Sequence, residues 1–191
     1  PPSRHARLDG GTAVPSESLK SVFQSFPGVG FPDHLRHLSR LDYGPRDGIV
    51  ENLPPVTGNP YPALVSNVDQ DGNDVAGIRL PDVSVPLASV PGWNLRHPDT
   101  GGPGQTHKTM GSTLPFAFTK QERQDTSDPR PSIEERYASR QDYLDRVETA
   151  AQDLASERYM LEEDVSRVSE MAGERYDLLE SRVKEAQPAG D

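Results

Sequence analysis

Residues 61–96 read YPALVSNVDQDGNDVAGIRLPDVSVPLASVPGWNLR and hold the clearest strand signature in the chain. Two apolar runs, at residues 63–68 and 75–80, flank the segment DQDGN at residues 69–73, whose members tolerate turn geometry. This pattern predicts a short β-hairpin. A third run, residues 83–90, alternates apolar with smaller side chains. Its prolines remove backbone donors, so the pattern favours an edge strand or an extended crossing.

Upstream of this stretch the local patterns are short. Four apolar residues at helical spacing predict a helix near residues 17–26, and either Ser16 or Ser18 is placed to cap its start. Residues 33–44 fit either a turn of helix or a strand, and residues 49–50 are a possible short strand.

Downstream, the sequence changes character after a proline-rich breaker. Ser132 and Ser139 each precede an acidic residue by three positions, which is the spacing of a capping box. Residues 139–157 and 162–183 each carry a single apolar stripe at helical period, and a short apolar joint lies between them. These signals predict two or three amphipathic helices, the longer two forming an antiparallel pair.

Composition agrees with a loop-rich α+β fold. Only 32% of the chain is hydrophobic, and 18 of its 19 prolines and 14 of its 16 glycines precede residue 132. Such a segment favours loops and short strands over a large core. The predicted parts are a loop-rich arm at 1–60, the hairpin and extended loops with the Gly-Trp-Asn stretch at 61–131, a helical cap at 132–185 and a tail at 186–191.

The charge distribution excludes several classes of partner. The net charge is −10, and residues 132–191 hold 16 acidic and 8 basic residues. No basic patch is available for phosphate contacts, so we expect no binding to nucleic acid. There is no cysteine, no apolar run of membrane-spanning length and no signal-peptide pattern at the start. These features leave the compartment undecided.

The sequences of several segments resemble the carboxyl-terminal part of a large bacterial family of α/β hydrolase domain proteins. The resemblance is carried by ARLDGGTAVPSESL, FPGVGFP, LDYGP, DGNDVAGIRLPDVSVPLASVPGWNLRHP, GSTLPFAFTKQERQDTSDPRPSIEERYASRQDYLDRV and LEEDV, in unbroken order. It implies that the catalytic core precedes residue 1, and that this chain packs on that missing core. The chain begins Pro-Pro, and we therefore expect a fragment of a longer protein. The resemblance implies no cofactor.

No residue of this chain is predicted to be catalytic. A serine hydrolase of this class needs G-x-S-x-G or a near variant, and Ser112 has neither the second glycine nor a helix start after it. His34 and His37 have a spacing that suits two metal ligands, but a polar surface turn explains them, and no metal site is expected. The Asp-rich turn lacks the spacing of a calcium loop.

The segment around Trp93 is the best candidate for binding. Trp93 could cover a substrate at a pocket mouth, with Asn94 close by and Arg96 meeting a carboxylate. Alternatively, Trp93 is an anchor in the core domain, while Asn94 and Arg96 hold loop carbonyls. His97 follows at once, but the resemblance places the catalytic histidine of the family upstream of this segment.

Two functions follow as expectations. The first is the carboxyl-terminal segment of a serine-type hydrolase of ester-like substrates, inactive when alone. The alternative is a non-enzymatic, acidic binding or structural module that docks on another protein.

Overall fold

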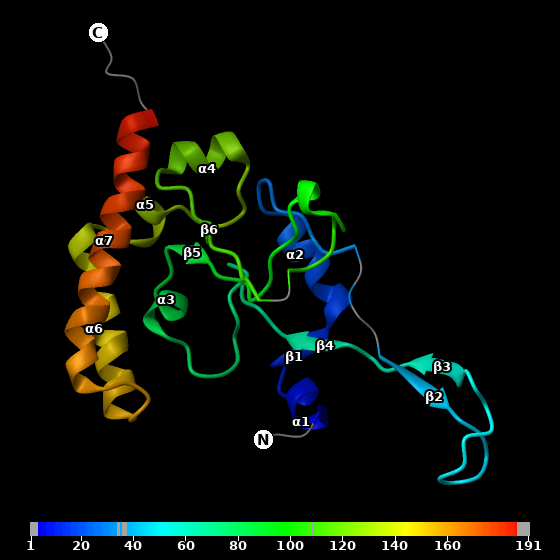
Figure 1. Ribbon diagram of the computed structural model, residues 1–191. Coiled ribbons are helices and arrows are strands. Elements are labelled where there is room, and N and C mark those ends of the chain that lie inside the picture. Colours follow the sequence, from blue (N-terminus) through cyan, green and yellow to red (C-terminus); the bar gives the residue numbers. More distant parts are fainter. Residues whose placement is uncertain (1–3, 34, 36–37, 108, 187–191) are drawn as a thin grey trace.

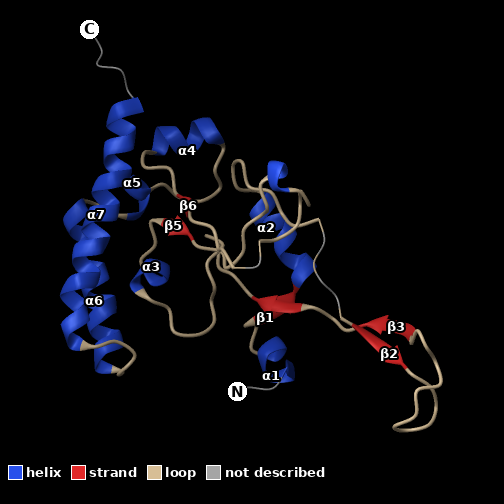
Figure 2. Ribbon diagram, viewed as in Figure 1, coloured by secondary structure: helices blue, strands red, loops and turns tan. Residues whose placement is uncertain are grey.

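The computed structural model describes residues 4–33, 35, 38–107 and 109–186, and within them most of the chain outside the C-terminal helices is loop (Figure 2). The helical elements are, in chain order, α1 (Arg4–Asp9), the 3₁₀ turn η1 (Ser16–Leu19), α2 (Lys20–Gln24), α3 (Pro81–Ser84), the 3₁₀ turn η2 (Pro98–Thr100), α4 (Lys120–Thr126), α5 (Ile133–Arg136), α6 (Arg140–Ser156) and α7 (Glu162–Ala186). The fold is α+β, and among the described residues the long elements are α6 and α7.

The strands form three small antiparallel sheets of two strands each. The strands are β1 (Ala13–Pro15), β2 (Ser39–Asp42), β3 (Val56–Pro60), β4 (Leu64–Ser66), β5 (Ala88–Ser89) and β6 (Leu114–Pro115). They pair as β1 with β4, β2 with β3 and β5 with β6. Two of these pairs, β1–β4 and β5–β6, therefore join segments that are distant in sequence.

The predicted hairpin is realised only at its turn. One antiparallel bridge, Val68 with Asp74, closes the segment 69–73. The first apolar run does not continue the pairing with the second, because β4 pairs instead with β1 in the register Val14 with Val65. The run from Val75 to Leu80 forms no strand, and most of its aliphatic side chains are exposed.

Other local predictions had mixed outcomes. The helix near 17–26 is confirmed as η1 and α2, but neither Ser16 nor Ser18 caps it with a side-chain hydrogen bond, so that part was wrong. Within residues 83–90, Val83 and Ser84 end α3, whose first turn accommodates Pro81 because a missing N–H costs nothing there. Ala88 and Ser89 form the strand β5 of a two-stranded sheet, so the predicted edge strand is confirmed in part. Residues 49–50 lie in a loop rather than a strand.

The C-terminal helices confirm the predicted antiparallel pair (Figure 1). Ser132 and Glu135 form a complete capping box at α5, and the Ser139 hydroxyl accepts from the Asp142 N–H at α6. Between the two long helices Arg158 adopts a left-handed conformation that reverses the chain. The inward stripes bury a set that we call the helical core: Leu87, Phe116, Ile133, Tyr137, Tyr143, Val147, Ala172 and Tyr176.

A second cluster lies at the N-terminal half of the chain. We call it the aromatic core, and its buried members are Leu19, Phe23 and Phe26. Partly buried residues from distant segments pack against it: Val14, Val22, Val29, Phe31, Val65, Val68, Trp93 and Leu114. This cluster explains why α2 forms although it is only a few residues long, because its apolar face is buried.

The β2–β3 pair extends away from both cores (Figure 1). All five residues of β3 are exposed, as are three of the four in β2. Large apolar side chains in this arm face solvent, among them Leu38 at 78% and Leu53 at 84% exposure. The arm therefore presents apolar surface that the described part of the chain leaves uncovered.

Candidate functional site

Trp93 lies where the loop after β5 crosses the aromatic core. Its ring contacts Phe23 edge-on, with centroids 5.1 Å apart and planes at 81°, and Phe31 in the same manner at 5.6 Å and 77°. The preceding Pro91 is buried and stiffens the approach. Trp93 itself is only half-buried, so part of the indole stays accessible.

A cavity of about 300 Å³ opens beside this cluster. Its lining is mostly apolar and includes all three rings, with Leu19, Leu35, Val65 and Val68 around them. Ser16, Ser66, Asp74 and Thr106 supply the polar side chains. A small apolar hollow with a few polar groups is the usual form of a ligand site.

The structure brings Trp93 to this cavity but leaves its two predicted companions outside the lining. Arg96 donates from Nη2 to the carbonyl oxygen of Thr100 at 2.9 Å, and its N–H donates to the Gln105 carbonyl oxygen at 2.9 Å. The Asn94 carbonyl oxygen accepts from the N–H of His107 at 2.7 Å. These two residues therefore hold the loop that carries Thr106 into the cavity lining.

Asp74 is the charged residue among the described ones that line the cavity. Partial burial, and then repulsion from Asp69, raise the pKa of its carboxyl above the ordinary value. Arg79 pairs with Asp69 rather than with Asp74, since its Nη2 donates to Asp69 Oδ2 at 2.7 Å and to the Val83 carbonyl oxygen at 2.9 Å.

The turn at 69–73 forms the wall behind the aromatic rings. Asp69 Oδ1 accepts from the N–H groups of Asp71 and Asn73, both at 3.0 Å. Gly72 has a φ of +78° and faces the aromatic core so closely that a Cβ would lie 2.8 Å from a ring carbon of Phe26 and 3.1 Å from one of Phe23. Only glycine fits this approach without displacement.

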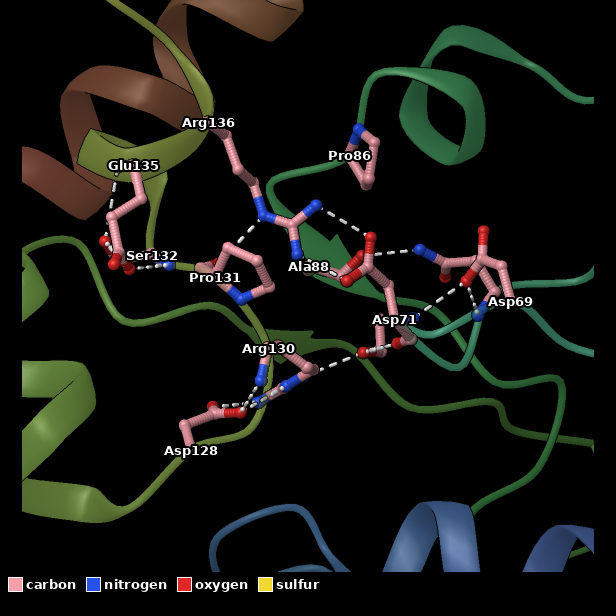
Figure 3. Close-up of polar contacts among 12 residues, drawn as sticks. Asp69, Asp71, Pro86, Ala88, Asp128, Arg130, Pro131, Ser132, Glu135 and Arg136 are labelled. Atoms are coloured by element: carbon pink, nitrogen blue, oxygen red, sulfur yellow. Dashed lines mark hydrogen bonds and ion pairs between the residues drawn. The ribbon is translucent and has the colours of Figure 1, made fainter.

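A group that we call the polar network ties the turn to later segments, and it comprises Asp71, Asn73, Ser89, Asp128, Arg130 and Arg136. Figure 3 shows the pair of Arg136 with Asp71 and that of Arg130 with Asp128. Arg136 donates from Nη1 to Asp71 Oδ2 at 2.7 Å and from Nη2 to Oδ1. Ser89 donates its hydroxyl proton to the Asp71 carbonyl oxygen and accepts from Arg130 Nη1 at 2.8 Å. Asn73, which has no exposed surface, accepts from the Val90 N–H at 2.8 Å and donates to the Ala88 carbonyl oxygen at 3.1 Å.

Arg130 joins the two cores. It is 4% exposed and donates to Asp128, also buried, from Nε at 2.9 Å and from Nη2 at 2.6 Å. Its guanidinium lies 4.4 Å from the ring centre of Phe26 in the aromatic core and 5.2 Å from that of Phe116 in the helical core. Such a paired and stacked arginine has no free donor for a substrate, so we regard it as structural.

Sequence reasoning missed this network. The segment Asp128-Pro-Arg130-Pro was interpreted only as a chain breaker. The short Asp-x-Arg spacing, set between prolines in an apolar context, is the one local signal that could have indicated a buried pair. The partner of Asp71 lies 65 positions away and has no local signal at all.

No activated nucleophile is formed by the candidates. The Ser112 hydroxyl donates to the Trp93 carbonyl oxygen at 2.8 Å, so its proton goes to a backbone acceptor rather than to a base. His97 lies 3.4 Å from Asp99, but both side chains are largely exposed, at 70% and 89%. Tyr137 is equally unsuited as a base, since burial raises its pKa to about 12 and its hydroxyl donates to the Pro86 carbonyl oxygen at 2.9 Å.

The described residues form neither a metal-ligand cluster nor a membrane-spanning helix. No cluster of three or more potential ligands occurs among the described residues, while His34 and His37 lie outside them. Each helix in the described ranges is too short or too polar to cross a bilayer.

Comparison with known proteins assigns a family. Residues 33–170 match the model of the alpha/beta hydrolase domain family, which covers the turn, the Trp93 loop, the polar network and most of the helical pair. The chain therefore belongs to the alpha/beta hydrolase domain family. No curated protein and no solved structure matches it.

Proposed function

We propose that this chain is the carboxyl-terminal, non-nucleophile part of a serine-type hydrolase that acts on ester-like substrates, and that it does not hydrolyse them alone. The observation that carries the proposal is the family match over residues 33–170. Within the chain no pentapeptide fits G-x-S-x-G, and Ser112 donates to a carbonyl oxygen. The nucleophile would then come from a catalytic core outside these 191 residues.

The cavity beside Trp93 is the part of this chain that would meet the substrate. Trp93 would contact it directly, since its half-buried ring lines the cavity. Asn94 and Arg96 would act indirectly, because their hydrogen bonds hold the loop that completes the lining of the cavity. In this proposal Trp93 binds the substrate directly, while Asn94 and Arg96 position the loop.

The β2–β3 arm would supply the contact with the catalytic core. Its exposed aliphatic and aromatic side chains form an apolar surface of the kind that proteins usually cover. In this arrangement residues 1–131 would carry the β2–β3 pair and the Trp93 cavity. The helices of residues 132–185 would form the cap on the side away from the catalytic core.

Labelling with a fluorophosphonate probe tests the proposal. We expect the purified 191-residue chain to give no covalent adduct and no turnover of p-nitrophenyl butyrate above the buffer rate, whereas a longer gene product that includes the core should be labelled on a serine outside these residues. The matched control is Ser112→Ala, which should behave as the parent chain does. Stoichiometric labelling that disappears in Ser112→Ala would contradict the proposal.

The non-enzymatic alternative is favoured by one observation. Residues 132–191 carry 16 of the 30 acidic residues, and the outward faces of α6 and α7 are charged and exposed. An acidic module could dock on a basic partner through these faces. The coding sequence before residue 1 discriminates: an in-frame G-x-S-x-G motif supports the hydrolase, and a separate start codon supports the module.

A further inference from the structure

The three rings of the Trp93 cavity have a defined mutual geometry. Phe23 and Phe31 are nearly parallel, with planes at 26° and centroids 6.3 Å apart, and Trp93 is close to perpendicular to both. Phe23 is 1% exposed and holds the arrangement in place, while Phe31 and Trp93 are half-buried. The accessible parts of these two rings therefore belong to the cavity wall. An aromatic face attracts a positive charge through its quadrupole.

A carboxylate without a described partner lies in the same cavity. Among the described residues no side chain donates to the Asp74 carboxyl, and Arg79 is taken up by Asp69 and the Val83 carbonyl oxygen. Since Arg79 balances the charge of Asp69, the charge of Asp74 is the one in the lining that no described residue pairs. An unpaired carboxylate in the lining disfavours an anionic ligand and favours a cationic one.

We infer that this cavity binds a compact organic cation, a substituted ammonium whose apolar groups pack on Phe31 and Trp93 and whose charge is met by Asp74. The volume of about 300 Å³ is at the small end for ligand sites, so the ligand is small. This inference deepens the proposed function and rests on it in one respect, namely that the Trp93 cavity is where the substrate binds. It names the class of that substrate as one with an amine or quaternary ammonium group.

Fluorescence of Trp93 gives a direct test, because it is the only tryptophan in the chain. The probes are choline and 3,3-dimethylbutan-1-ol, which share shape and differ in charge, titrated into the 191-residue chain at pH 7.5 and constant ionic strength. We expect choline to bind at least tenfold more tightly than the neutral alcohol. Asp74→Asn should reduce choline affinity at least fivefold and leave the affinity for the alcohol unchanged. Asp99→Asn, which removes an exposed carboxylate outside the cavity, is the matched control and should change neither.

A second pair of variants tests the rings. Phe31→Leu should lower the preference for choline over the alcohol, and Phe31→Tyr should retain it, with folding of each variant checked by circular dichroism. Equal affinity of the parent chain for both probes, or no binding of either, would overturn the inference. So would a preference for choline that Asp74→Asn and Phe31→Leu leave intact. None of these readouts needs a nucleophile, so their failure is distinguishable from an unexpected result of fluorophosphonate labelling.

Discussion

The guanidinium of Arg136 and the carboxylate of Asp71 form a two-point ion pair between residues 65 positions apart in the sequence. Their side chains are 16% and 14% exposed, and Arg136 also stacks on Phe116 at 4.1 Å. The pair fastens the turn at the back of the Trp93 cavity to the helical cap. It therefore links the turn behind the candidate site to α5, the short helix that leads into the two long ones.

The energetic weight of this pair can be measured with a double-mutant cycle. Arg136→Met is expected to lower the free energy of unfolding by about 2–4 kcal/mol, because it leaves the Asp71 carboxylate buried and unpaired. Urea denaturation of Arg136→Met, Asp71→Asn and the double variant should give a coupling energy of about 1–3 kcal/mol. The equally bidentate but exposed pair of Arg140 with Asp177 is the control and should show a much smaller coupling. Similar coupling in the two pairs would contradict the role assigned to Arg136.

Gly72→Ala should be strongly destabilising. The new Cβ would combine a positive φ with a contact of 2.8 Å to Phe26, so we expect a loss of about 2–4 kcal/mol. Gly77 has a φ of +86° but open space around it, and Gly77→Ala should cost only about 1 kcal/mol. Thermal unfolding of both variants separates backbone strain from the ring contact. Equal losses of stability in the two variants would show that the aromatic core rearranges around the new methyl group without cost.

Ser132→Ala tests the start of the helical cap. Ser132 is fully buried, its hydroxyl accepts from the Glu135 N–H at 3.3 Å, and its own N–H donates to Glu135 Oε2 at 3.0 Å. We expect a loss of about 1–2 kcal/mol. The exposed Ser139→Ala, at the start of α6, should lose no more than about 1 kcal/mol. The reverse order in chemical denaturation would show that the capping box at α5 is dispensable.

Trp93→Ala separates anchoring from binding. Truncation of a half-buried indole that touches two phenylalanines should cost about 2–3 kcal/mol, while Trp93→Phe should retain most of the stability. In a longer product with the catalytic core, Trp93→Phe should raise KM more than it changes kcat. A Trp93→Ala variant with the melting temperature of its parent would rule out the anchoring role.

Asp74 should make stability depend weakly on pH. A raised pKa means that the folded chain binds this proton more tightly than the unfolded chain, so its contribution is complete below about pH 4 and is lost as pH rises through the folded pKa. Asp74→Asn should therefore stabilise the chain at pH 7, by less than about 0.5 kcal/mol because the group is solvent-exposed, and leave stability unchanged at pH 3. Melting curves at the two pH values measure the difference. A variant less stable at pH 7 would mean that a cation already pairs with Asp74.

The helical cap could be predicted from sequence because its signals are local. The two cap serines and the apolar stripes lie within one or two turns of the groups they act on. The sheets could not be predicted in the same way. β4 pairs with β1, which lies about 50 residues earlier in the sequence, and an apolar run alone does not indicate which strand it pairs with. The polar network was hidden for the same reason.

Only part of the candidate site could be predicted from the sequence. Trp93 stood out because a lone tryptophan between prolines is conspicuous, but pocket and anchor both need a large ring, and the structure gives it contacts of both kinds. The expected roles of Asn94 and Arg96 depended on where a loop turns, which short-range patterns do not determine. Asp74 was not predicted as a site residue, because the cavity that it lines is formed with residues from distant segments, among them Phe23, Phe31 and Trp93.

The polar network also sets an order of events during synthesis. A ribosome that adds 5–20 residues per second needs roughly 3–13 s to reach Arg136 after Asp71 has been made. During that interval the hydrogen bond between Asp69 and Asn73 can already shape the turn at 69–73, but Arg136, which anchors the turn, has not yet been translated. The turn would therefore stay unfastened until Arg130 and Arg136 emerge, whereas the aromatic core can form earlier, because all of its members except Leu114 precede residue 94. The order of folding expected during synthesis is thus the aromatic core first and its attachment to the helical cap last.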